Sequence, residues 1–241
     1  MTSTIFYEEE YAKNLLKNGF AYFMSFDDLS ALARYFKYMG KNKLQIRKSL
    51  IEFCKKWNPD FNEILARNKI ENAIKVTDKY GIRFPMDVNI TTSELEKIKS
   101  AGNYKKQKIL FVILVIAKYF KYNDTSLEKK KIDKCSDRFF ANENITNILR
   151  MARVNASKKE RINIQYELQR DGFITSIGEK SFEVHIVDDN PNISIVVSNM
   201  NNIVDFYPFY CEKCGRIVQK TGNRQKYCLE CYKKIEIIKQ W

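Results

Sequence analysis

The chain has 241 residues, of which 44% are hydrophobic, and its 42 Lys and Arg outnumber 29 Asp and Glu, for a net charge of +13. This length and apolar content suit a globular protein of one large domain or two or three small ones, and the charge favours a polyanionic partner, either nucleic acid or an anionic membrane surface. A single His excludes most acid–base and nucleophile-activating schemes.

The positive charge is concentrated in two parts of the chain. Residues 91–170 carry 18 basic and 9 acidic side chains, and residues 211–241 carry 8 and 3. Residues 1–90 carry 15 and 11, whereas residues 171–210 carry only 1 and 6. Because a solvated surface usually mixes both signs, this segregation indicates binding surfaces for a polyanion in the middle of the chain and at its C-terminal end.

Residues 1–90 are predicted to form an all-α bundle of three helices after an aromatic-rich start. The first helix follows an acidic cap at residues 26–28, the second begins near Asn42, and the third covers about residues 61–80. The apolar stripe predicted for the third helix consists of Ile64, Leu65, Ile70, Ala73 and Ile74. The turn at residues 38–43 is similar to a helix–turn–helix joint, but an ordinary helical hairpin is the favoured interpretation.

A capping box at Thr91-Thr-Ser-Glu94 predicts a helix start, and the run from Ile109 to Ala117 is entirely apolar. This run is far shorter than the roughly 20 residues that span a bilayer, so we predict a buried helix rather than a membrane segment. Residues 121–137 are polar and are expected to form a loop.

Residues 140–190 predict two helices followed by a hairpin. The first helix covers residues 142–152, with Ile145, Ile148 and Leu149 facing inward, and a turn at residues 153–155 follows it. A capping box at Ser157 opens the second helix, which runs through Arg170. We expect Ile162, Tyr166 and Leu168 to face the core from this helix. Period-two alternation then predicts a two-stranded hairpin, with His185 as a surface residue rather than a ligand.

The order helix, turn, helix and hairpin resembles the winged-helix DNA-binding domains of bacterial and phage regulators and replication initiators. The resemblance implies that the second helix enters the major groove, where Lys and Arg meet phosphates or guanine and Asn and Gln pair with adenine. The DNA-binding residues predicted on this basis are Lys158, Lys159, Arg161, Asn163 and Gln165. A winged helix used only for protein contacts is the alternative.

Residues 191–210 are predicted to connect the winged helix to the C-terminal segment through a turn and a strand. The aromatic segment 206–210 is expected to pack the C-terminal segment against the winged helix.

The C-terminal segment contains two C-x-x-C pairs, formed by Cys211, Cys214, Cys228 and Cys231. Such pairs are typical of a structural zinc site, in which four thiolates leave no open coordination position. Two disulfides and plain buried thiols are the alternatives. Disulfides need an oxidising compartment, and the N-terminal sequence is not that of a secretory signal peptide. The remaining cysteines, Cys54 and Cys135, are expected to be reduced thiols. The spacing resembles the four-cysteine ribbon or treble-clef tails of proteins from phages and mobile elements.

Taken together, these features predict a mainly α (α+β) protein: a helical bundle at 1–90, a winged helix at 91–190, a strand connector at 191–210 and a zinc ribbon at 211–241. The sequence has no Walker loop, G-x-G-x-x-G, H-E-x-x-H or paired acidic nuclease motif in a predicted structural context that fits it, so we expect a protein that is not an enzyme. The function expected is sequence-preferring binding of double-stranded DNA in the cytoplasm, as a transcriptional regulator or replication initiator of a phage or mobile element, with one structural Zn²⁺ and no membrane partner. An adaptor or inhibitor that binds a host protein and an RNA-binding protein remain alternatives.

Overall fold

A computed structural model describes residues 5–20, 24–123, 138–178, 181–188, 192–211, 213–214, 217–218 and 225–239. The chain divides into two compact units: Met1–Met86 with Tyr119–Asp137, and Asp87–Lys118 with Arg138–Trp241. Both units are mainly helical, and the described strands form small sheets. The chain is therefore of the mainly helical α+β class. The first boundary falls slightly before the predicted one at residue 90.

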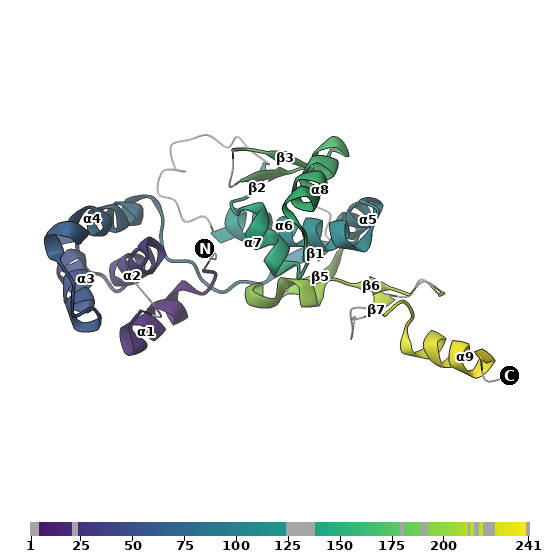
Figure 1. Ribbon diagram of the computed structural model, residues 1–241, viewed down its shortest axis with the longest axis horizontal. Coiled ribbons are helices and arrows are strands. Elements are labelled where there is room, and N and C mark those ends of the chain that lie inside the picture. Colours follow the sequence, from purple (N-terminus) through teal and green to yellow (C-terminus); the bar gives the residue numbers. More distant parts are fainter. Residues whose placement is uncertain are drawn as a thin grey trace. The chain divides into compact units, whose positions relative to one another are not determined.

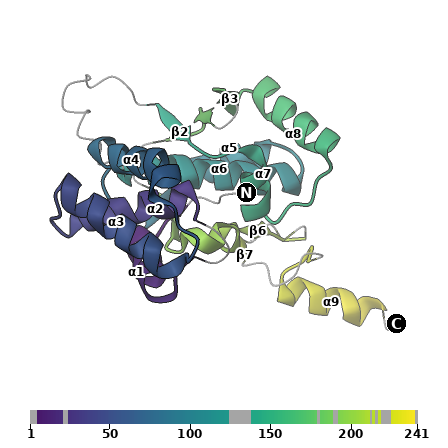
Figure 2. The ribbon, with the colours of Figure 1, turned by 60° about the vertical axis from the view of Figure 1, so that its left-hand side comes forward.

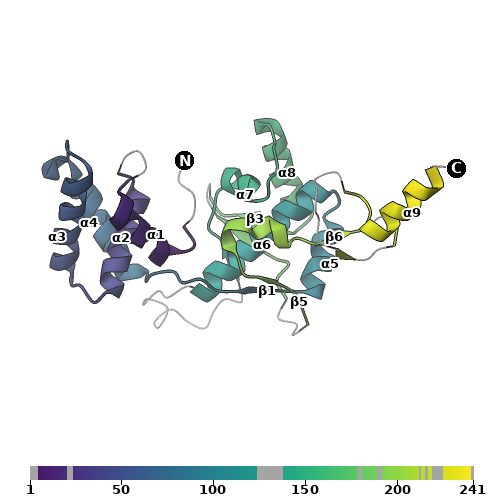
Figure 3. The same ribbon diagram turned by 90° about the horizontal axis from the view of Figure 1, so that it is seen from below.

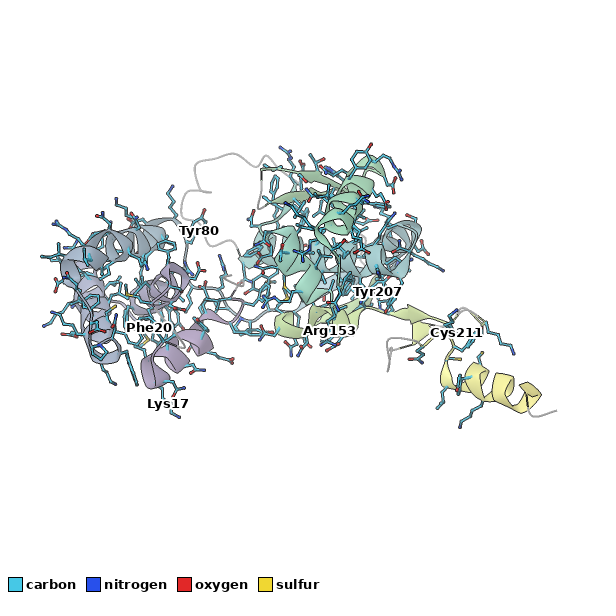
Figure 4. The ribbon with its side chains drawn as sticks, viewed as in Figure 1. Lys17, Phe20, Tyr80, Arg153, Tyr207 and Cys211 are labelled. Atoms are coloured by element: carbon cyan, nitrogen blue, oxygen red, sulfur yellow. The ribbon has the colours of Figure 1, made fainter. Side chains whose placement is uncertain are left out.

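The described residues of the first unit up to Met86 form four helices, one more than the sequence predicts, because residues 8–18 also form a helix. These helices, shown in Figure 1, are α1 (Glu8–Asn18), α2 (Phe26–Tyr38), α3 (Lys43–Trp57) and α4 (Glu63–Lys79). Helix α2 contacts the other three, and its Leu29 and Leu32 are fully buried. Phe20, labelled in Figure 4, packs edge-to-face on Phe53 with ring centroids 4.9 Å apart.

The start of α4 differs from its predicted apolar stripe. Ile64 and Leu65 are 84% and 83% exposed, whereas Ile70 and Ala73 are buried. The side chain of Asn62 caps the helix by accepting hydrogen bonds from the backbone N–H groups of Ile64 and Leu65. At about 100° per residue, the first turn points these two side chains away from the face that continues through Ile70, so their assignment to the core was wrong.

A buried ion pair ties α1 to the rest of the first unit. Glu8 is fully buried and accepts two hydrogen bonds from the Arg34 guanidinium, at 2.9 Å and 2.5 Å. It also accepts one from the backbone N–H of Arg83 at 3.0 Å. These donors offset the cost of burying a carboxylate.

The second unit begins with β1 (Val88–Thr91), which pairs antiparallel with β5 (Ile193–Val197). Val88 lies opposite Val197 and Ile90 opposite Ile195, and the two strands run side by side in Figure 3. The segment predicted as a connector therefore belongs to this unit. It continues through a 3₁₀ helix, Met200–Phe206, that the sequence did not predict.

Helix α6 (Tyr104–Asn123) forms the core of the second unit, and its residues beyond Lys118 belong to the first. Every residue from Ile109 to Ala117 is fully buried, which confirms the predicted buried helix. Among the residues described, no helix combines the length and the apolar character needed to cross a bilayer. The aromatic segment before the cysteines packs on α6 through Tyr207, whose ring centroid lies 5.1 Å from that of Phe111.

Three further helices of this unit flank α6 in the sequence, and three short strands form an antiparallel sheet. The strands are β2 (Phe139–Ala141), β3 (Ile174–Ser176) and β4 (Phe182–Val184), in the order β2-β4-β3. The helices are α5 (Thr92–Ser100), α7 (Ile145–Met151) and α8 (Lys158–Arg170). The predicted capping boxes at Thr91 and Ser157 are both present, and Figure 2 shows α8 leading into β3.

Candidate functional site

The four predicted metal ligands converge on one point. Their sulfur atoms all lie within 4.8 Å of one another. Cys211 directly follows β6 (Phe209–Tyr210), which pairs with β7 (Ile217–Val218). Cys231 lies in α9 (Leu229–Lys239), and Cys228 directly precedes that helix. Figure 4 labels Cys211 at the start of this segment. A hairpin and a helix start thus bring two C-x-x-C pairs together.

The sulfur spacing fits metal coordination rather than a disulfide. The Sγ atoms of Cys214 and Cys228 are 3.8 Å apart. A tetrahedral site with metal–sulfur bonds of about 2.3 Å has sulfur–sulfur edges of about 3.8 Å, whereas a disulfide bond is about 2.05 Å long. The backbone N–H of Cys231 also donates a hydrogen bond to Cys228 Sγ at 3.4 Å, a contact common around the sulfur ligands of metal sites. The four cysteines can therefore bind a metal ion.

The protonation behaviour of these thiols also favours a cation. Burial opposes ionisation of Cys211, but hydrogen bonds from the backbone N–H groups of Cys228, Cys214 and Lys213 lower its pKa to about 6. Burial raises the pKa of Cys231, and hydrogen bonding among the neighbouring sulfurs raises it further. Four thiolates this close repel one another, so all four can ionise together only when a cation balances their charge.

The second candidate site is helix α8, which begins at the Ser157 capping box and has two distinct faces. Lys158, Lys159 and Asn163 are exposed, as expected for residues that contact a ligand. Arg161 and Gln165 are only partly exposed. The Arg161 guanidinium donates to Ala156 O at 3.0 Å and to Thr146 Oγ1 at 3.3 Å. Gln165 Nε2 donates to Ser176 Oγ of β3 at 2.8 Å.

The prediction for the inward face of α8 was wrong at two of its three positions. Leu168 is fully buried, but Ile162 and Tyr166 are 60% and 63% exposed. Counting back from Leu168 by three, four and seven residues gives the positions that face inward, namely 165, 164 and 161. The sequence signal that could have identified this face is the helical spacing of three, four and seven residues counted back from Leu168. The signal was obscured because two of those positions are polar. In the preceding helix α7, Ile148 and Leu149 are buried as predicted, and Ile145 is half-buried.

Each acidic group on α8 already has a partner. Glu160 accepts a hydrogen bond from the backbone N–H of Ser157 at 2.7 Å, and this bond lowers the pKa of its carboxyl group. Glu167 forms an ion pair with Lys106 of α6. In the part of the chain that the structure describes, Lys158 and Lys159 have no acidic partner. Lys158 and Lys159 are therefore exposed cations without an ion pair, next to the exposed carboxylate of Glu160.

The turn between α7 and α8 is held by Arg153, which Figure 4 labels. Its φ is +50°, in the left-handed region that non-glycine residues rarely adopt. Its guanidinium donates to both carboxylate oxygens of Asp205, at 2.5 Å and 2.8 Å, and Lys108 Nζ donates to its carbonyl oxygen at 3.3 Å. These contacts fix the turn that positions α8. The sequence predicted the turn but not this role.

The remaining predicted residues have mixed outcomes. His185 is exposed, as predicted, and its Nε2 lies 2.8 Å from Thr175 Oγ1. Cys54 is a buried free thiol, whereas Cys135 lies outside the described residues. Among the basic side chains of the C-terminal segment, Lys213 and Lys226 are exposed. Gly215, Arg216, Lys220 and Arg224 lie outside the described residues.

Comparisons with protein-family models, curated proteins and solved structures find no match for this chain.

Proposed function

We propose that this chain is a sequence-preferring protein that binds double-stranded DNA through a winged helix, with a structural zinc ribbon at its C-terminal end. The order α6, β2, α7, α8, β3, β4 and the sheet order β2-β4-β3 support a winged helix. In this arrangement α8 is the recognition helix, because it is the second helix of the helix–turn–helix and precedes the hairpin.

The observation that carries the proposal is the charge on the outward side of α8. Lys158 and Lys159 are exposed and have no acidic partner among the described residues, while Glu160 and Glu167 are both engaged. A basic helix face of this kind attracts phosphates, and Asn163 on the same side can pair with adenine in the major groove. Arg161 and Gln165 have partners inside the unit, so we now assign them to positioning the helix.

We assign zinc to the four-cysteine site. Sulfur-only tetrahedral coordination is typical of Zn²⁺, and four protein ligands leave no position for a substrate or a reactive water. The ion would hold together a segment too small to fold through apolar burial alone. Exposed Lys213 and Lys226 on the folded ribbon would then add contacts to DNA phosphates. The biological role is that of a transcriptional regulator or replication initiator of a phage or mobile element.

Fluorescence anisotropy with duplex DNA, single-stranded DNA and RNA at two salt concentrations tests the proposal. We expect preferential binding to duplex DNA that persists at the higher salt concentration. The Lys158→Ala/Lys159→Ala variant should bind all duplexes more weakly and lower the salt slope by about two. A matched control is Lys75→Ala/Lys79→Ala on α4, which removes the same charge from two exposed positions of the first unit.

If the control weakens binding as much as the α8 variant, net charge rather than α8 explains the affinity. Equal, weak and salt-sensitive binding to all three nucleic acids would contradict sequence-preferring recognition of duplex DNA. Tighter binding to RNA would instead favour the RNA-binding alternative. The protein would then bind by another mode, because the major groove of an RNA helix is too narrow to admit α8.

A protein partner for the helical bundle is a second candidate function. Leu44, Ile64 and Leu65 are 72%, 84% and 83% exposed. Ile64 also lines a pocket of about 470 Å³ between α3 and α4, together with Ile51 and Arg47. Exposed apolar side chains and a pocket lined by charges of both signs favour a protein over a polyanion as the partner. Replacing Ile64 and Leu65 with Ser should leave DNA binding unchanged and abolish capture of such a partner.

A further inference from the structure

Helix α8 presents large apolar side chains to solvent on the same side as its free polar ones. Ile162 is 60% exposed and Tyr166 is 63% exposed. They are four residues apart and therefore lie on one face of the helix, one turn from each other. Lys159 and Asn163 lie on this face too, at the i−3 and i+1 positions relative to Ile162. We call these four residues the outer stripe of α8.

Most of the surface of the two apolar side chains in the outer stripe is open to solvent. Helix α8 is held from its other side, where Leu168 is fully buried and Gln165 bonds to Ser176. Single exposed apolar residues are common on proteins. Here, however, two of them flank an amide side chain. The stripe contains one charged residue, Lys159, and exposed Arg170 follows one turn beyond Tyr166. This combination matches a surface that offers both hydrogen-bonding groups and apolar groups.

We propose that the outer stripe recognises A·T base pairs in the major groove, with Asn163 bound to adenine and Ile162 and Tyr166 packed on thymine methyl groups. This inference rests on the DNA-binding function proposed above. Among the four bases, only thymine presents an apolar group in the major groove, its C5-methyl. Asn makes two hydrogen bonds to adenine, at N6 and N7, and cannot make the same pair with guanine.

The dimensions of the helix and of the duplex agree with this assignment. With a rise of about 1.5 Å per residue, Ile162 and Tyr166 are separated by about 6 Å along the helix axis. Base pairs follow each other at about 3.4 Å, so the two side chains reach two or so successive base pairs. Asn163 lies between them along the axis. We therefore expect the preferred site to contain adenine next to thymine within one short A·T run.

The charges around the stripe favour DNA over a protein as its occupant. Lys158 and Lys159 stand at the N-terminal end of the helix, and neither has an acidic partner among the described residues. Arg170, at the other end, is 59% exposed and pairs only with the adjacent Asp171 among the contacts observed for it. The N-terminal end of the helix thus carries two lysine charges that can meet DNA phosphates, while the centre of the stripe is neutral.

The test uses the full-length, metal-loaded protein. Its preferred duplex is first selected from a random library, and each thymine of that duplex is then replaced by deoxyuridine. This replacement removes only the C5-methyl and keeps the base pair. We expect the selected duplex to contain an A·T run and the affinity to fall about fourfold for each contacted methyl group.

Two variants sharpen the result. At the position that Ile162 contacts, replacing thymine with deoxyuridine should hardly change the affinity of Ile162→Ala for the duplex. Leu44→Ala, which removes an exposed apolar side chain from the first unit, should keep the full difference between the two duplexes. 7-Deazaadenine lacks the N7 acceptor of adenine. Placing it where Asn163 is proposed to bind adenine should weaken binding by wild-type protein but not by Asn163→Ala.

The outcomes separate this inference from the proposed function. Tight duplex binding with no difference between thymine and deoxyuridine overturns the recognition of methyl groups but leaves DNA binding intact. Absence of duplex binding overturns both. If Ile162→Ala retains the thymine preference but dissociates an oligomer seen by sedimentation, the outer stripe is a contact between copies of the chain and the inference is wrong.

Discussion

Lys118 Nζ lies 2.7 Å from Glu94 Oε2, and the two residues are only 3% and 0% exposed. Glu94 also accepts hydrogen bonds from the backbone N–H groups of Thr91, at 2.9 Å, and Asp188, at 3.0 Å. One carboxylate thus caps α5, pairs with α6 and holds the segment that follows β4. Because Lys118 further donates to Asn89 O at 2.9 Å, the ion pair also fixes β1.

Glu94→Gln should strongly destabilise the second unit. The substitution keeps the size of the side chain but leaves the Lys118 ammonium buried without a counter-charge, which typically costs about 3–5 kcal/mol. Urea unfolding measures this change. Lys97→Ala is the control, because it breaks the exposed pair with Asp188 and should cost less than about 1 kcal/mol. Equal effects of the two substitutions would show that burial of the Glu94–Lys118 pair has no energetic consequence.

Gly19→Ala should destabilise the first unit more than Gly40→Ala. Both glycines have a positive φ, of 76° and 81°, so each substitution strains the backbone, by roughly 1–2 kcal/mol. At Gly19 a Cβ would also lie 2.6 Å from the indole ring of Trp57, whereas nothing lies within 4 Å at Gly40. We expect an extra cost of about 1–3 kcal/mol from this overlap. Equal midpoints in thermal unfolding would contradict the close approach.

The local features of the fold could be predicted from the sequence, since they depend on residues close together in the chain. The capping boxes at Ser157 and Thr91 join side chains and backbone groups three residues apart, and the cysteine spacing encodes its own hairpin. The pairing of β1 with β5 could not be predicted, because the two strands are separated by most of the second unit. It depends on which apolar faces meet after the helices have packed.

The faces of α8 show why the exposure of the residues proposed to bind DNA was only partly predictable. Hydrophobicity favoured Ile162 and Tyr166 as core residues, but Arg161 and Gln165 occupy the inward positions beside Leu168. These long polar side chains can turn inward because Thr146, Ala156 and Ser176 supply their partners. Such partners come from other elements, and a periodicity within one helix contains no information about them.

Stability of the first unit should decrease between about pH 9 and pH 11, partly because of Cys54. Burial raises the pKa of this thiol to about 11. A thiol in the unfolded chain ionises near pH 8.5, so above that pH the unfolded state releases a proton that the folded state retains. Stability from this group is therefore complete below about pH 8.5 and is lost as the pH rises towards 11.

Urea unfolding at several pH values measures this loss, which we expect to be on the order of 3 kcal/mol for Cys54. Cys54→Ala should be less stable at neutral pH because it leaves a small cavity, but its stability should fall less steeply above pH 9. Burial also raises the pKa of Tyr11. Because both proteins contain Tyr11, it accounts for the decrease in stability with pH that remains in Cys54→Ala. Parallel curves for the two proteins would contradict a neutral buried Cys54.

One zinc ion per chain should be found by metal analysis of protein purified without chelators, and Cys214→Ser should lose it. Cys214 is the exposed member of the ligand set, so its substitution disturbs packing least and tests coordination most directly. Loss of the ion should unfold α9, an 11-residue helix, and reduce the helical circular dichroism accordingly. The core around α6 should unfold at the same urea concentration as before. Cys54→Ala serves as the control and should retain its zinc.

Asn163→Ala and Gln165→Ala should affect different properties of the protein, although the two amides are close together on one helix. The first should change base preference and the second should change stability. Asn163 is exposed, so its loss should leave stability unchanged and relax base preference at one position, by about 1–3 kcal/mol. Gln165 bonds to Ser176 Oγ, so its loss should cost about 0.5–1.5 kcal/mol of stability and weaken all duplexes alike. Unfolding curves and binding to the preferred duplex and its single-base variants measure both effects. A change of base preference in Gln165→Ala, with none in Asn163→Ala, would reverse the assignment of the two faces of α8.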